Sequence, residues 1–188
     1  MRLGILGAAA LCMTLAHGIA SAKPLEASRP NATTALTNTY WYVPTAYLPA
    51  LRYDPNTGTG AAISDQTVWR ITHSADGYFW GDTAAVFSGD NAGAAGKAPS
   101  CSKMVGTLTP SGDALISFVN SRSSTTGIGR LKDMKGEKVF QMQMSAGEKT
   151  MTLHWADMAR CQPGQACWSK LPGSDLGIEA FLAQCDAQ

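Results

Sequence analysis

The sequence lacks the features that mark several functional classes. After residue 22 it has no apolar run long enough to cross a bilayer as a helix, so we expect no membrane insertion of the mature chain. Lys and Arg number 15 and Asp and Glu 14, and the counts become equal once Arg2 is removed. A neutral chain has no basic surplus to attract nucleic acid or anionic lipid, so no nucleic-acid partner is expected.

Catalytic and metal-binding motifs are equally scarce. Neither G-x-S-x-G nor H-E-x-x-H occurs, and neither glycine-rich segment, 58–60 or 89–96, follows a strand and opens into a helix. Beyond residue 22 the only histidines are His73 and His154, too few for a usual zinc site. The sequence therefore predicts no metal, no cofactor and no catalytic residues.

The N-terminus has the three parts of a secretory signal peptide. Arg2 is the positive start, residues 3–16 are an apolar run, and Ala20-Ser21-Ala22 is a small-x-small cleavage site. The alternative, a retained anchor, would need a run of about 20 apolar residues. We therefore expect residues 1–22 to be removed after Ala22, together with Cys12, and the mature protein to be periplasmic or secreted.

Removal of Cys12 leaves an even number of cysteines, as expected for an exported chain with two disulfides. Three connectivities are possible in principle. Cys161 and Cys167 enclose a Pro-Gly turn that brings them together, so Cys101 is predicted to pair with Cys185. The alternative of metal binding is disfavoured, because C-x5-C is not a usual zinc spacing.

The mature chain divides into a leader and one domain. Residues 23–38 show no periodicity and predict a flexible leader, and residues 39–188 predict a single domain. A run rich in Pro and Gly at 44–64 predicts a long loop of the kind that covers a binding site, and 88–100 predicts a second loop. Between and after them, β-rich runs alternate with turn signals such as Asp76-Gly77.

These runs predict about eight strands in one antiparallel meander. Alternation is clearest in the last pair, where Phe140, Met142 and Met144 share one face, as do Met151 and Trp155. We expect the meander to close as a β-barrel, because closure removes the exposed edge strands. The methionines are interpreted as core residues. Near the C-terminus, residues 178, 181, 182 and 185 share one face of a helix, which a disulfide of Cys185 would hold on the barrel.

This architecture resembles the calycin-type small barrels, the lipocalins and the avidin-like proteins. The resemblance rests on the eight-stranded meander, on Trp41 in the first strand and on a C-terminal helix fixed by a cysteine. It departs from the lipocalin pattern G-x-W, because Trp41 follows Thr39-Tyr40. It implies a barrel that holds a small ligand, at the level of fold analogy.

The aromatic residues are the candidates for a binding site. If the barrel has a pocket, the sequence predicts that five side chains line its wall: Trp41, Tyr42, Trp69, Trp80 and His154. The alternative is that the aromatic side chains simply fill the barrel, as in most small barrels.

Three functional hypotheses follow. The leading one is an exported binding protein that holds a small apolar or aromatic ligand inside the barrel. The alternative is an inhibitor or adhesion module that contacts a protein partner through loop 88–100 or the Cys161–Cys167 loop. The third is an enzyme that uses His-x-Ala-Asp, which occurs at 73–76 and 154–157, although each Asp also fits a strand-ending turn.

Overall fold

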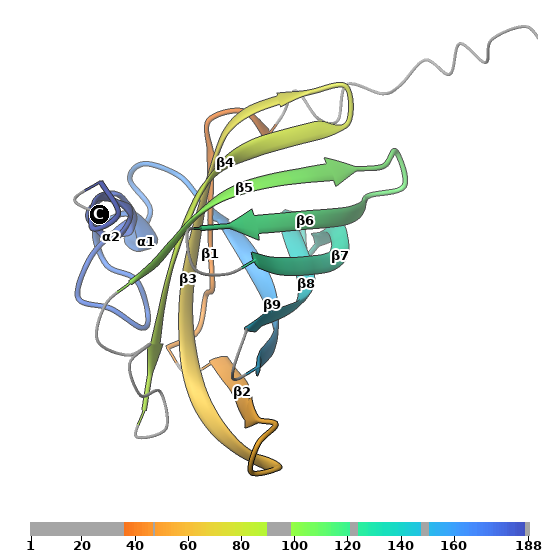
Figure 1. Cartoon of the computed structure of the whole chain (residues 1–188). Helices are drawn as coiled ribbons and strands as arrows, with labels where there is room; N and C mark the ends of the chain where they lie inside the picture. The colour runs from red at the N-terminus through yellow and green to blue at the C-terminus, as the bar shows by residue number, and fades with distance from the viewer. Residues whose placement is uncertain (1–35, 47, 90–98, 121–123, 148–150, 187–188) are drawn as a thin grey trace, which may run out of the picture.

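The computed structural model describes residues 36–46, 48–89, 99–120, 124–147 and 151–186. The proposed signal peptide, most of the leader, Tyr47 and most of loop 88–100 lie outside the described residues. The described part is mostly strand (Figure 1). The strands are β1 (Thr39–Tyr42), β2 (Leu48–Asp54), β3 (Thr59–Ala75), β4 (Tyr78–Ser88), β5 (Ser100–Leu108), β6 (Asp113–Val119), β7 (Ser124–Met134), β8 (Glu137–Gly147) and β9 (Met151–Cys161).

The sheet closes into an eight-stranded antiparallel barrel, as predicted. Each strand from β3 to β9 pairs with the next along the chain, and β9 pairs back with β1 and β2. Both β1 and β2 lie between β3 and β9, β1 against residues 68–71 of β3 and β2 against residues 59–65. They act as two halves of one interrupted strand, so nine strands occupy eight positions.

The prediction of a long loop at 44–64 is wrong, because this segment contains β2 and the beginning of β3. The turn between them is short and includes Gly58, whose φ is +67°. Pro49 is tolerated because the pairing of β2 with β9 begins only at Ala50. Pro44 lies in the gap between β1 and β2, where the barrel strand is interrupted.

Aromatic side chains fill the middle of the barrel. The ring of Phe140 lies 4.6 Å from Trp41, 5.7 Å from Trp69 and 6.0 Å from Phe79, measured between ring centroids. All four side chains are almost fully buried. A Cβ at Gly106 would lie 2.3 Å from the ring of Phe79, so the sheet needs glycine there to admit this ring.

Two short helices cover one side of the outer wall, α1 (Ala166–Ser169) and α2 (Ile178–Ala183) (Figure 1). Ile178, Phe181 and Leu182 of α2 are buried in one cluster with Val68 of β3 and Ala84 of β4. Helix α2 begins at Ile178, after Gly177. The predicted apolar helix face is the one that packs on the barrel.

Both predicted disulfides are present. Cys101 at the beginning of β5 is bonded to Cys185 just after α2, and Cys161 at the end of β9 is bonded to Cys167 in α1. These bonds indicate an oxidising compartment. Leu36, which belongs to the predicted leader, is buried with the barrel core. Among the described residues, none of the helices has the length and apolarity to span a membrane.

Candidate functional site

The barrel wall separates the five predicted ligand-binding residues into two groups. Trp41 and Trp69 belong to the cluster inside the barrel. His154 lies two residues before the buried Ala156 in β9, so its side chain is on the same face of the strand and also points inward. Tyr42 and Trp80 have the opposite orientation. Tyr42 packs on the outer cluster under the helices, and the Trp80 side chain is 43% exposed. The five residues therefore do not form one wall.

His154 makes its closest charged contact with a residue that sequence reasoning missed. Its Nδ1 lies 2.6 Å from Oδ2 of Asp65, and both side chains are almost fully buried inside the barrel. The imidazole N–H is not aligned on this oxygen, so no hydrogen bond forms, and the contact is an ion pair only when the imidazole is protonated. Thr67 donates its hydroxyl to Asp65 at 2.8 Å. Residues 65 and 154 are far apart in the sequence, and strand β2 lies between their strands in the sheet, so no local sequence pattern could have predicted the contact.

The two His-x-Ala-Asp segments do not form His–Asp pairs. In a strand, residues three apart point to opposite faces, so Asp157 lies outside the barrel while His154 faces inward. His73 stacks on Trp80 at 5.3 Å between ring centroids, and Asp76 lies in the turn to β4 with a φ of +51°. The turn interpretation of Asp76 is thus favoured over a catalytic one.

The two helices cover one side of the barrel only (Figure 1). Outside the area that they cover, the outer wall of β4 to β9 exposes many apolar side chains. Where exposed apolar side chains gather, they mark a site of interaction. Met151 belongs to it, which corrects its interpretation as a core residue. The exposed apolar side chains of these strands are Tyr78, Trp80, Val105, Leu115, Val119, Ile128, Met134, Met151, Leu153 and Trp155.

A groove of about 670 Å³ lies in this wall, over β6 to β9. We call it the wall groove. Its lining residues are Asp113, Ala114, Ile128, Gly129, Arg130, Lys132, Gln141, Met142, Gln143 and Trp155.

The register of the strands arranges the wall groove in two neighbouring rows. In one row Leu115, Ile128, Gln143 and Trp155 are direct cross-strand partners, and the side chains of Ile128 and Trp155 are 56% and 57% exposed. The next row consists of partners with polar side chains: Asp113, Arg130, Gln141 and Asp157. The wall groove thus sets a strip that is apolar except for Gln143 beside a polar strip.

The polar side chains of the wall groove are held by one another. Arg130 donates from Nε to Asp113 at 2.8 Å, and the Lys132 ammonium donates to the side-chain oxygen of Gln141 at 2.5 Å. Gly129 lets the backbone of β7 approach β8, since a Cβ there would lie 2.0 Å from the Gln141 carbonyl oxygen. These contacts fix the polar groups before any ligand arrives.

The sequence held a signal for this groove. The alternation of β8 places Gln141 and Gln143 outside, and the antiparallel pairing of β8 with β9 brings Trp155 beside Gln143. A large apolar side chain such as tryptophan is uncommon at an exposed strand position of a surface that binds nothing.

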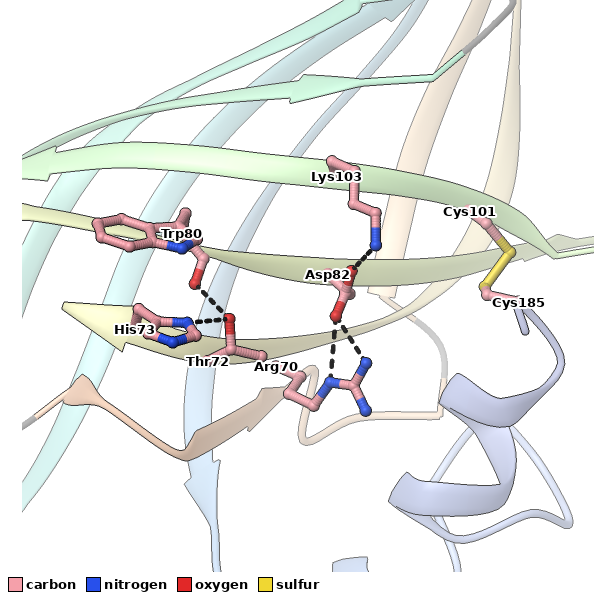
Figure 2. Close-up of polar contacts among 8 residues, drawn as sticks. All are labelled: Arg70, Thr72, His73, Trp80, Asp82, Cys101, Lys103 and Cys185. Carbon is pink, nitrogen blue, oxygen red and sulfur yellow. Dashed lines mark hydrogen bonds and ion pairs between the residues drawn. A yellow bond between two sulfur atoms is a disulfide. The ribbon is translucent and has the colours of Figure 1, made fainter.

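A second polar cluster lies beside the Cys101–Cys185 disulfide (Figure 2). Asp82 accepts a hydrogen bond from Nη2 of Arg70 at 2.6 Å and one from the Lys103 ammonium at 2.5 Å. Burial raises the pKa of Asp82, but the hydrogen bonds and charges of Lys103 and Arg70 together outweigh it. The pKa of Asp82 therefore lies below its ordinary value.

The variant Asp82→Asn is expected to lower stability at neutral pH by about 1 kcal/mol or less, because Arg70 and Lys103 are well exposed to solvent. A carboxyl group with a lowered folded-state pKa stabilises the fold above its unfolded-state pKa and loses this effect as the pH falls through the folded-state value. The difference between wild type and variant should shrink below about pH 4. Thermal unfolding from pH 7 to pH 2.5 measures it, and a constant difference would contradict the ion-pair account.

Within the described residues there is no group of three or more His, Cys, Asp or Glu placed to hold a metal ion. Comparisons with protein-family models, with curated proteins and with solved structures found no match.

Proposed function

We propose that this chain is an exported binding protein that recognises its ligand on the outer wall of the barrel, in the wall groove. The observation that carries the proposal is the wall groove itself, with a tryptophan side chain more than half exposed at its edge. Exposed aromatic side chains beside a few fixed polar groups are the usual composition of a binding site.

The packing of the barrel favours the wall over the interior. Trp41, Trp69 and Phe140 occupy the middle of the barrel in mutual contact, where a ligand would otherwise lie. Displacing a buried aromatic side chain costs about 3–5 kcal/mol, which a small ligand would have to recover. Trp155 and Ile128 are already exposed and need no such displacement.

Export is the second part of the proposal. It is supported by the two disulfides, which form in oxidising compartments, and by the signal-peptide pattern of residues 1–22. The ligand is then to be sought outside the cytoplasm.

The indole N–H signals of the protein's five tryptophans provide a direct test. In a two-dimensional ¹H–¹⁵N spectrum each tryptophan gives one indole signal. Titration with small amphipathic probes such as cyclohexanol and phenol should shift the Trp155 signal saturably. Trp80 is the matched control, because it is an exposed outer-wall tryptophan outside the wall groove. Shifts confined to Trp80, or absent at all five positions, would contradict the proposal.

A second candidate function is the binding of a small apolar or aromatic ligand inside the barrel, as for the calycin-type barrels. The buried contact of Asp65 with His154 favours it, together with Nε1 of Trp69, which is buried and has no hydrogen-bond partner among the described residues. Such groups can bind the polar group of an otherwise apolar ligand. In the same titration this candidate predicts that the Trp69 signal shifts and the Trp155 signal does not.

A further inference from the structure

We propose that the wall groove binds a neutral oligosaccharide, with one sugar ring stacked on the indole of Trp155. This inference rests on the proposed function and names the class of its ligand. A sugar ring has an apolar face, formed by its C–H groups, and a rim of hydroxyl groups. A site for it needs an apolar plate beside several hydrogen-bonding side chains.

The wall groove has both parts in the correct arrangement. Trp155 and Ile128 form the apolar strip, and Arg130 and Gln141 lie in the adjacent row. A hydroxyl group both donates and accepts hydrogen bonds, so it can bind amide, guanidinium and carboxylate groups alike. The row crosses four strands, which at the usual strand spacing is about 14 Å, enough for a short chain of sugar rings.

The charges of the wall groove favour a neutral ligand. Its lining holds two cations, Arg130 and Lys132, and the carboxylate of Asp113, and Asp157 follows Gln141 in the polar row just outside the lining. Arg130 is directly paired with Asp113. The groove therefore offers many hydrogen-bonding groups and little net charge, which suits a polyhydroxylated ligand better than a strongly charged one.

Closure of the barrel argues against an extended peptide as the ligand. Peptides that add to a sheet pair with the free backbone groups of an edge strand. Strands β6, β7, β8 and β9 each have a neighbour on both sides, so the wall groove offers side chains only. A ligand of the wall groove must then be bound by stacking on an aromatic ring and by hydrogen bonds to side chains. A saccharide would be bound in this way.

Calorimetric titration of the full mature protein tests the inference with three probes: cellohexaose, maltohexaose and hexagalacturonate. We expect saturable binding of at least one neutral oligosaccharide, with an affinity that hardly changes between 50 mM and 500 mM salt. Trp155→Ala should weaken it about tenfold or more, because the stacking plate is lost. Gln143→Ala, next to Trp155, should weaken it less. Trp80→Ala is the matched control and should leave it unchanged.

Several results would overturn the inference. These are no binding of either neutral probe, binding that Trp155→Ala leaves intact, or tighter and salt-sensitive binding of hexagalacturonate. A dimer in sedimentation analysis that Trp155→Ala dissociates would assign the wall groove to a second copy of the chain. If cyclohexanol shifts the Trp155 signal while no neutral oligosaccharide binds, the saccharide inference fails and the proposed function stands. If neither binds, both fail.

Discussion

Replacing His154 by leucine should destabilise the fold by about 3–5 kcal/mol. The substitution leaves the Asp65 carboxylate, which is fully buried, without the imidazole that now lies 2.6 Å away. Removing one partner of a buried ionisable pair carries this cost when the remaining group is an uncompensated charge. Equilibrium unfolding in urea, followed by tryptophan fluorescence, measures the difference.

The double variant Asp65→Leu/His154→Leu separates the lost charge contact from the lost packing. It should recover most of the stability, since two apolar side chains replace the pair and no buried charge remains. His73→Leu is the matched control, because His73 lies on the outer surface, and it should change stability by about 0.5 kcal/mol or less. A loss of less than about 1 kcal/mol in His154→Leu would show that Asp65 does not depend on His154.

Loss of the Cys101–Cys185 disulfide is the second large effect. This bond joins residues 84 positions apart, whereas Cys161 and Cys167 are six apart. By loop-closure entropy, removing the long-range bond should cost about 4.5 kcal/mol and removing the short-range bond about 2 kcal/mol. The paired variants Cys101→Ser/Cys185→Ser and Cys161→Ser/Cys167→Ser test this in urea unfolding, and each serves as the control for the other.

The order of the two costs is the decisive result. A larger loss from the short-range pair would mean that α1 and its loop stabilise the barrel more than the attachment of α2 does. Limited proteolysis adds an independent measurement. We expect the Cys101→Ser/Cys185→Ser variant to be cut first after α2, because the bond holds the chain end at the beginning of β5.

The sequence predicted correctly those elements of the fold that a single local pattern determines. Strict alternation predicted β8 and β9, and the Asp76-Gly77 signal predicted the turn between β3 and β4. Closure of the barrel followed from the avoidance of free edges. The disulfides followed from the short loop around Pro163-Gly164, which leaves Cys101 for Cys185.

Other features depend on three-dimensional context. In Thr39-Tyr-Trp-Tyr42 both faces of the strand are aromatic, because one faces the barrel interior and the other lies under the helices. Hydrophobicity alone therefore does not show that Trp41 points inward and Tyr42 outward. Strand β2 was missed because Pro49 is its second residue, where a proline is tolerated only because the pairing with β9 begins at Ala50.

The candidate site was the least predictable part. The Asp65–His154 contact joins strands that are 89 residues apart, as the residue numbers show, and are separated by β2. The wall groove depends on four strands being in one register, so that Ile128, Gln143 and Trp155 become neighbours. The sequence predicted a pocket inside the barrel, whereas the structure has its groove on the outer wall.

The central claim is that the ligand lies on the wall and not in the barrel. A crystallographic soak with cyclohexanol, and with the neutral hexasaccharide that calorimetry shows to bind, tests it most directly. The account predicts density for both compounds over the indole of Trp155, with Trp41, Trp69 and Phe140 unmoved. Density beside His154 and Asp65 inside the barrel, with the Trp155 surface empty, would contradict it.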